Sequence, residues 1–314
     1  MNKCLFGDCR DSMRQLIKDG VKVQTCVTSP PYWGLRDYGN DGQLGLEETP
    51  EKYTENMVEV FSLVKELLND DGTLWLNLGD SYTSGGRSRY CSGEELSKSN
   101  NLQKTSKSWL ETDGQFRPDT PAGLKPKDLI GIPWRVAFAL QQDGWYLRQD
   151  IIWHKPNPMP ESVTDRCTKS HEYIFLLSKS PKYYYDNEAI GEKTITQDNS
   201  NRDRDTTRLN NTPGRTKMNG LKTNNYETRN KRSIWTVNTK PYDGAHFAVF
   251  PEELIEPCIL AGSKKDDIVL DPFFGSGTTG QVSQNLGRKW IGCELNEEYE
   301  GLQKKRTDQM ALPL

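Results

Sequence analysis

The 314-residue sequence has no long hydrophobic run and no pattern of paired cysteines. No stretch approaches the ~18 consecutive apolar residues of a transmembrane helix, and the N-terminus shows no apolar segment of signal-peptide length. We therefore expect no membrane association, no export and a cytoplasmic location. The seven cysteines are scattered without a C-x-x-C pair, so neither a disulfide framework nor a metal site is predicted.

Apolar residues make up only 34% of the chain, and the formal net charge is only −3. This small net charge hides an uneven distribution. Residues 193–232 contain ten Lys and Arg against four acidic residues, a net charge of +6 that leaves −9 for the rest of the chain. The segment is rich in Asn and Thr and cannot form a core of its own. It is either a solvated loop or a surface that pairs with phosphates and reads base edges.

Strand-like and helix-like segments alternate along the chain, which is typical of a doubly wound α/β fold. β-rich runs cover residues 23–27, 73–78, 146–153, 267–270 and 289–293. Apolar residues recur at helical spacing over residues 50–68, 133–142 and 251–261. Residues 172–177 and 182–185 are expected to form a hairpin, which places an antiparallel edge on a mostly parallel sheet of about seven strands.

A glycine-rich turn, Asp-Pro-Phe-Phe-Gly-Ser-Gly-Thr-Thr at residues 271–279, connects a predicted strand to a predicted helix. Glycines let the backbone approach a ligand and a helix N-terminus offers free N–H groups, so a nucleotide-like cofactor suits this position. Glu294 ends the next strand, where its carboxylate can accept hydrogen bonds from both ribose hydroxyls. The glycine spacing is close to that of a dinucleotide fingerprint, but the preceding Asp-Pro-Phe-Phe is unlike a dehydrogenase turn.

The sequence Ser29-Pro30-Pro31-Tyr32 follows the first of the predicted strands. Its prolines end the strand and leave carbonyl groups without ladder partners. The Pro30 carbonyl and the Ser29 hydroxyl can then accept hydrogen bonds from the same amino group, which directs the nitrogen lone pair toward an electrophile. The Tyr32 ring offers a stacking face for a planar base.

Residues 28–32 and 271–279 together resemble the catalytic and cofactor motifs of the DNA methyltransferases that methylate amino groups with S-adenosyl-L-methionine. Because the catalytic motif comes first, the order resembles the circularly permuted beta class of that family. Gly7-Asp8, residues 153–157 and residues 246–251 resemble three further motifs of the class. The resemblance therefore covers nearly the whole chain.

The resemblance implies a catalytic domain formed by residues 1–190 and 233–314. Within it, residues 82–125 are rich in Ser, Lys and Gly without a periodic pattern, which predicts a polar loop insertion. Residues 191–232 correspond to the target-recognition region of the family. The expected DNA contacts in that region are Arg202, Arg204, Arg208, Arg215 and Lys217. Double-stranded DNA is the expected partner. A homodimer and a cognate restriction endonuclease stay open as further partners.

The resemblance also implies roles for individual residues. Ser29, Pro30, Pro31 and Tyr32 are the expected catalytic residues, with the target base flipped onto Tyr32. In the cofactor site, Asp8 is expected to accept a hydrogen bond from the adenine amino group, Glu294 to hold the ribose and Phe273 to pack on the adenine. The residues expected to surround the methionine part are Phe247, Phe250, Asp271, Pro272, Gly275, Ser276, Gly277 and Thr278.

The identity of the target base depends on the first residue of the catalytic motif. In the family, Ser at this position occurs mostly with cytosine N4 as the target, and Asp or Asn mostly with adenine N6. Ser29 therefore favours cytosine N4, with adenine N6 as the alternative. A non-catalytic DNA-binding protein on the same fold is a rival hypothesis, and so is an enzyme that methylates RNA or a protein amide. The intact acceptors at Ser29 disfavour the first rival, and the basic segment disfavours the second.

Overall fold

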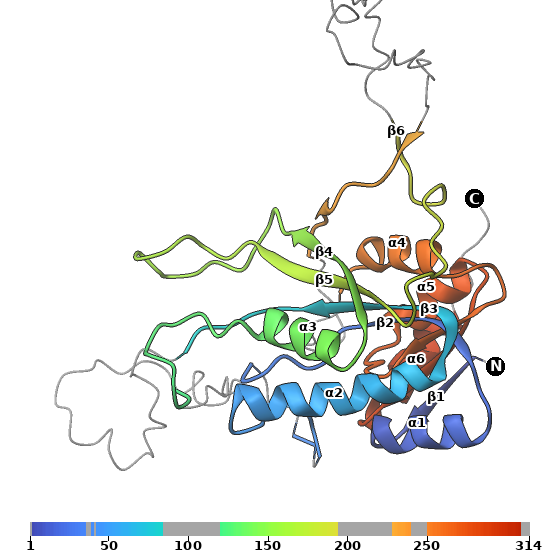
Figure 1. Cartoon of the computed structure of the whole chain (residues 1–314), viewed down its shortest axis with the longest axis horizontal. Coiled ribbons are helices and arrows are strands. Elements are labelled where there is room, and N and C mark those ends of the chain that lie inside the picture. Colours follow the sequence, from blue (N-terminus) through green and yellow to red (C-terminus); the bar gives the residue numbers. More distant parts are fainter. Residues whose placement is uncertain are drawn as a thin grey trace, which may run out of the picture.

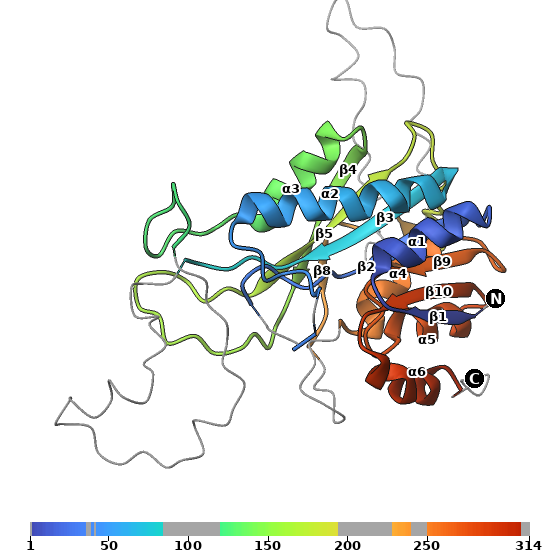
Figure 2. The same cartoon turned by 90° about the horizontal axis from the view of Figure 1, so that it is seen from below.

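The computed structural model describes residues 2–35, 39–40, 42–83, 120–193, 228–239 and 250–308. Its central element is an eight-stranded sheet with the order β1-β10-β9-β2-β3-β5-β4-β8 (Figure 1). Helices cover both faces of this sheet, as the view from below shows (Figure 2). Among these residues, no helix is long and apolar enough to cross a membrane.

One half of the sheet consists of five neighbouring parallel strands: β1 (Lys3–Phe6), β10 (Lys289–Glu294), β9 (Ile268–Asp271), β2 (Val23–Thr28) and β3 (Leu68–Leu78). In the other half, β5 (His171–Ser178) runs antiparallel to both of its neighbours, β3 and β4 (Tyr146–His154). The short strand β8 (Ile234–Thr236) pairs parallel with β4. The mostly parallel, doubly wound α/β fold expected from the sequence is confirmed.

The reversed strand differs from the expectation in its position and its partners. Residues 182–185 do not form a strand, because their tyrosines make other contacts. The Tyr185 ring stacks on Trp75 with centroids 6.3 Å apart, and the Tyr184 amide donates to the Asp71 carbonyl at 2.9 Å. The hairpin prediction is therefore wrong, and β5 lies inside the sheet. The sheet has eight strands where about seven were expected, and the four-residue β1 is too short for its pattern to be recognised.

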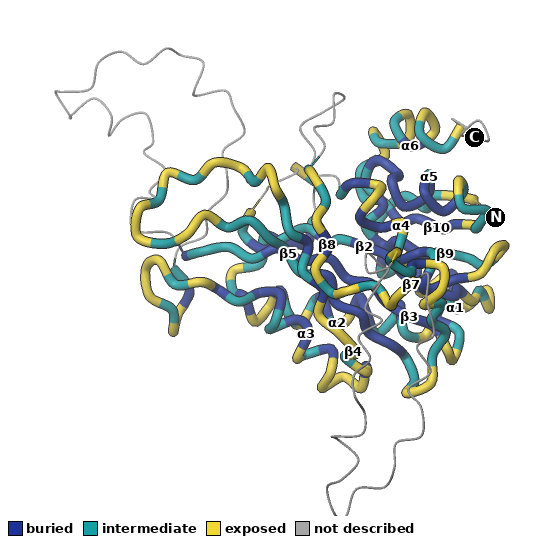
Figure 3. Tube along the Cα trace, turned by 90° about the horizontal axis from the view of Figure 1, so that it is seen from above, coloured by how far each residue is buried: buried dark blue, intermediate teal, exposed yellow. Residues whose placement is uncertain are grey.

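The helices form two layers. On one face lie α1 (Cys9–Lys18), α2 (Pro50–Leu67) and α3 (Ile132–Gln142), and on the other lie α4 (Glu252–Gly262) and α5 (Thr278–Asn285). The 3-10 helix Glu297–Tyr299 and α6 (Glu300–Thr307) follow β10, and α6 packs against α5. α2 begins where the sequence predicts, because the Thr49 hydroxyl accepts a hydrogen bond from the Lys52 amide at 3.1 Å. Each helix layer buries its own apolar cluster against the sheet. The buried stretches of the trace gather where the helices meet the central strands (Figure 3).

Both predicted insertions fall mostly outside the described residues. The described ends of the basic segment meet in a two-stranded ladder, where β6 (Glu192–Lys193) pairs antiparallel with β7 (Thr228–Arg229). Glu192 also forms ion pairs with Arg229 and Arg232, which reinforces this closure. The five predicted DNA contacts, from Arg202 to Lys217, and residues 84–119 of the polar insertion lie outside the described residues.

Candidate active site

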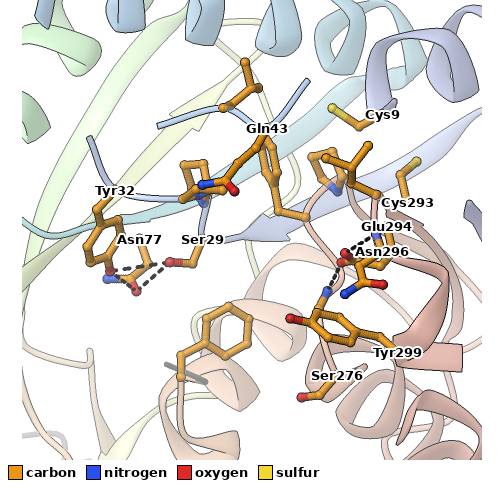
Figure 4. Close-up of a pocket in the computed structure, with 18 of the residues that line it drawn as sticks. Cys9, Ser29, Tyr32, Gln43, Asn77, Ser276, Cys293, Glu294, Asn296 and Tyr299 are labelled. Atoms are coloured by element: carbon orange, nitrogen blue, oxygen red, sulfur yellow. Dashed lines mark hydrogen bonds between the residues drawn. The ribbon is translucent and has the colours of Figure 1, made fainter. Parts of the chain in front are cut away.

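A cavity of about 460 Å³ opens at the carboxyl ends of the parallel strands. The chain continues from β2 through α2 to β3 on one side, and from β9 through α5 to β10 on the other. The loops after these two adjacent strands therefore diverge to opposite faces, and such a switch point is where open α/β sheets bind ligands. Both predicted motifs contribute to the cavity wall: the Ser29–Tyr32 loop after β2 and the glycine-rich turn after β9 (Figure 4).

The glycine-rich turn is held by Glu294 at the end of β10. The carboxylate accepts hydrogen bonds from the Gly275 amide at 2.7 Å and from the Asn296 amide at 2.9 Å. Gly275 and Gly277 have φ angles of +53° and +90°, a region that disfavours side chains. Burial raises the pKa of Glu294 above its ordinary value. The sequence thus places Glu294 correctly beside the turn, where its first role is to brace the backbone.

The two phenylalanines of the turn point to different environments. Phe274 is buried and stacks on Trp290 with centroids 4.8 Å apart. Its ring occupies the space where Gly292 would carry a Cβ, only 2.3 Å from the nearest ring atom. Phe273 instead lines the cavity together with Pro272, Gly275 and Ser276. The turn therefore has one anchor in the core and one side chain available to a ligand.

Three residues expected to contact the cofactor lie behind the cavity wall. Asp271, Gly277 and Thr278 are absent from the cavity lining, and a contact of these residues with the cofactor stays a prediction. Asp271 is 1% exposed, and its carboxylate accepts hydrogen bonds from the Thr28 and Thr279 hydroxyls, both at 2.6 Å. Burial raises the pKa of Asp271 to about 6. These contacts tie the end of β2 to the glycine-rich turn.

The cavity fits a polar, nucleoside-like group at this end. The Ser276 hydroxyl is buried at the cavity wall and has no hydrogen-bond partner among the described residues. Asp8 lines the same end, and the Arg10 guanidinium bound to its carboxylate at 2.6 Å lowers the pKa of Asp8. Phe250 also lines the cavity, whereas Phe247 lies outside the described residues. No cluster of metal-binding side chains occurs in the described parts of the chain.

The Ser29–Tyr32 loop forms the other end of the cavity. The Pro31 carbonyl already accepts a hydrogen bond from the Tyr53 hydroxyl at 2.9 Å, whereas no donor among the described residues reaches the Pro30 carbonyl. Ser29 Oγ lies 3.2 Å from Asn77 Oδ1 (Figure 4). The Tyr32 ring packs on Gly79, where a Cβ would come within 2.5 Å of a ring carbon. The loop is thus fixed with a free carbonyl and a hydroxyl at the cavity.

Sequence reasoning missed the side chains that surround this loop. The Tyr32 hydroxyl donates to Glu172 Oε2 at 2.7 Å, and Asn77 Nδ2 lies 3.3 Å from the same oxygen. Lys155 forms an ion pair with the other oxygen of Glu172, and its ammonium lies 4.1 Å from the centroid of the Trp153 ring. Burial raises the pKa of Tyr32 well above its ordinary value. The local signals that point to this network are a polar Asn within the apolar strand Leu74–Leu78 and the motif at residues 153–157, which contains Lys155.

Comparison with known proteins identifies a family and relatives with similar sequences. The family of DNA methylases (N6_N4_Mtase) matches residues 23–305. The chain is 50% identical to the type II methyltransferase M.SmaI of Serratia marcescens over 97% of this chain and 90% of that protein. It is also 50% identical to M.Cfr9I of Citrobacter freundii over 93% of this chain and 83% of that protein.

Solved structures show the same fold at lower identity. The PvuII DNA methyltransferase, described as cytosine-N4-specific, is 18% identical with a TM-score of 0.61, over 98% of this chain and 86% of that chain. The complex of M1.HpyAVI with S-adenosylmethionine is also 18% identical, with a TM-score of 0.54 over 98% of both chains. The family match and the extent of the similarity to its relatives show that the chain belongs to the S-adenosylmethionine-dependent DNA methylases that modify exocyclic amino groups.

Proposed function

We propose that this protein is a site-specific DNA methyltransferase that transfers a methyl group from S-adenosyl-L-methionine to N4 of a flipped cytosine. The observation that carries the proposal is the single cavity that contains the Ser29–Tyr32 loop at one end and the glycine-rich turn at the other. A cofactor held at the turn and a base held at the loop would share this space. Adenine N6 is the alternative target.

The cofactor end supplies the groups that a nucleoside with a charged tail requires. We assign the ribose to Glu294, because its two oxygens have lone pairs left after they accept hydrogen bonds from the Gly275 and Asn296 backbone amides. Phe273 offers an apolar face for the adenine, and Asp8 an acceptor for its amino group. The unpartnered Ser276 hydroxyl, with Pro272, Gly275 and Phe250, is available to the methionine part. When bound, S-adenosylmethionine supplies a methyl group on a positively charged sulfur, which is the electrophile.

The catalytic end orients the amine. The Ser29 hydroxyl and the Pro30 carbonyl accept hydrogen bonds from the two N–H groups of the amine, which directs the nitrogen lone pair away from the loop. An exocyclic amine attacks a sulfonium methyl group directly and loses its proton afterwards, so this site needs acceptors rather than a strong base. The raised pKa of Tyr32 keeps its phenol neutral, which suits a stacking surface.

The base must leave the double helix before it can enter the cavity. Unstacking costs roughly a few kcal/mol, which contacts of the flipped base with Tyr32 and the loop would offset. The choice of cytosine rests on Ser29, since Asp or Asn at this position accompanies adenine in the family. We assign recognition of the DNA sequence to residues 191–232, whose described ends are joined by the β6–β7 ladder. The cytoplasmic location, a homodimer and an endonuclease partner stay predictions.

The test is to express the chain in a host without DNA methylation and to read the host DNA by single-molecule sequencing. The expected result is N4-methylcytosine at one short sequence and no modification with the Ser29→Ala variant. N6-methyladenine at a defined site would select the alternative target. Unmodified DNA from cells that contain folded protein would contradict the proposal and favour a non-catalytic DNA-binding protein.

A further inference from the structure

The hydrogen bonds of Asn77 define which way its side-chain amide faces. Asn77 lies on β3, is 5% exposed, and lines the cavity behind the Ser29–Tyr32 loop (Figure 4). Its Nδ2 donates to the Tyr173 carbonyl at 3.0 Å and lies 3.3 Å from Glu172 Oε2. A carbonyl and an ionised carboxylate can only accept hydrogen bonds. The reversed amide would set its oxygen against both acceptors, so Oδ1 must face the hydroxyls of Ser29 and Tyr32.

The Tyr32 hydroxyl has one proton and two acceptors within reach. Glu172 Oε2 is 2.7 Å away and Asn77 Oδ1 is 3.1 Å away. The carboxylate is closer and carries a negative charge, so it is the stronger acceptor. Lys155 pairs with the other oxygen of Glu172, and both side chains are less than one-fifth exposed. This ion pair fixes the Glu172 carboxylate beside the Tyr32 hydroxyl, and the Tyr32 proton is directed toward it.

The Ser29 proton is then directed as well. On the protein side, Ser29 Oγ is 3.2 Å from Asn77 Oδ1 and 3.4 Å from Tyr32 Oη. When the Tyr32 hydroxyl donates its hydrogen bond to Glu172, both of these oxygens have lone pairs that can accept the Ser29 proton in a hydrogen bond. The Ser29 proton therefore points into the protein, and its lone pairs face the cavity. We propose that Asn77 and Glu172 are positioning residues that make Ser29 a hydrogen-bond acceptor for the target amine. This inference rests on the proposed function.

The direction of this proton matters for the reaction. A Ser29 hydroxyl that turned its proton into the cavity would donate to the nitrogen of the amine and occupy the lone pair that has to attack. When the Ser29 hydroxyl instead donates its hydrogen bond to Asn77 Oδ1, its oxygen can accept a hydrogen bond from an N–H group of the amine. The lone pair of the amine nitrogen then stays free. Asn77 thus acts through Ser29, and its effect on the rate should disappear when the Ser29 hydroxyl is removed.

A double-mutant cycle tests this dependence. Methyl transfer is measured in single turnovers at saturating S-adenosylmethionine, on DNA with the site found by sequencing. Asn77→Leu is expected to slow transfer about tenfold, and Ser29→Ala about a hundredfold. The double variant should be no more than about twofold slower than Ser29→Ala alone. Thr73→Val is the matched control, because Thr73 is buried on the same strand but bonds Thr25 outside the cavity. It should show no coupling to Ser29.

The outcomes separate this inference from the proposed function. If the effects of Asn77→Leu and Ser29→Ala multiply in the double variant, Asn77 acts independently of Ser29 and the inference is overturned. If Ser29→Ala alone leaves the rate unchanged, the assignment of Ser29 in the proposed function fails instead. If Asn77→Leu does not fold, Glu172→Gln replaces it in the cycle, because Glu172 is partly exposed and the substitution keeps its size. The effects of Glu172→Gln and Ser29→Ala on the transfer rate are again expected not to multiply in the double variant. If they multiply, the inference is overturned.

Discussion

The two ends of the cavity are built from different parts of the chain. At the cofactor end, backbone amides of Gly275 and Asn296 converge on Glu294, and the wall comes from short continuous segments. At the catalytic end, Ser29, Asn77 and Glu172 come from three separate strands or their ends and meet through side chains alone. Under the proposed function, we expect changes at the first end to alter affinity for the cofactor and changes at the second end to alter the rate of transfer.

The largest effect is expected at Asp271, which joins the two ends through Thr28 and Thr279. Its pKa is about 6 in the folded protein against an ordinary value of 3.8. Between these pH values the folded protein keeps a proton that the unfolded chain has released. The free energy of unfolding should therefore fall by about 2 kcal/mol as the pH rises from about 4 to about 6, out of about 3 kcal/mol over the whole titration. Denaturant unfolding of the wild type and Asp271→Asn measures this, since the variant lacks the titration. Parallel pH curves for the two proteins would contradict it.

Ser29→Ala is expected to slow methyl transfer by about a hundredfold, because one of the two acceptors for the target amine is removed. The affinity for S-adenosylmethionine should stay unchanged, since Ser29 lies at the opposite end of the cavity (Figure 4). Transfer rates and isothermal calorimetry on the same preparation check both statements. An equal loss of cofactor affinity would show that Ser29 has a structural role, and the comparison between the two ends would fail.

Glu294→Ala should give the opposite pattern. Removal of a charged acceptor for the ribose is expected to weaken S-adenosylmethionine binding by roughly 1.5–3 kcal/mol. Calorimetry measures the affinity, and the transfer rate at saturating cofactor should recover much of the wild-type value. Glu294→Gln is the matched variant, because it keeps the size of the side chain but replaces one of the two acceptor oxygens by an NH2 group that faces a backbone N–H donor. An unchanged affinity in Glu294→Ala would refute the ribose assignment.

The smallest effect per residue is expected in the basic segment. Replacement of Arg202, Arg204, Arg208 and Arg215 by Gln should weaken DNA binding and reduce the slope of log affinity against log salt by about 0.9 for each phosphate that is no longer neutralised. Cofactor affinity should not change. Filter binding over a series of salt concentrations measures the slope, and sequencing shows whether the methylation site is altered. If the slope and the site are both unchanged, recognition belongs elsewhere, with residues 82–125 as the first candidate.

The cofactor end could be predicted from the sequence because its parts are contiguous. Residues 271–279 indicate a strand, a turn and a helix, and Glu294 follows at the end of the next strand. The sequence could not show which turn residues face the cavity. Asp271 looks like a ligand-binding residue in the sequence, but its position under the Thr28 hydroxyl depends on the neighbouring strand, which is 243 residues away in the chain.

The catalytic end could be predicted only in part. Ser29-Pro30-Pro31-Tyr32 is a local motif, whereas Asn77 and Glu172 join it from 48 and 140 residues away, measured from Ser29 and Tyr32. Their contacts exist only because β3 and β5 are neighbours in the sheet. The reversed direction of β5 was expected, but its partners were not, since strand pairing depends on the whole sheet. Composition alone did not distinguish the tyrosines of residues 182–185 from a strand.

The β6–β7 ladder makes the chain leave and re-enter the domain at one place, with Lys193 opposite Thr228. When the ends of a loop are held together in this way, its length has little effect on stability, since each doubling costs only about 0.6 kcal/mol. Because the described ends are paired, we expect that exchanging the segment between Lys193 and Thr228 for one of another enzyme leaves the sheet and the cavity intact. If residues 191–232 read the DNA sequence, as proposed, a graft across these two strands should give an enzyme with a new sequence preference and the same chemistry.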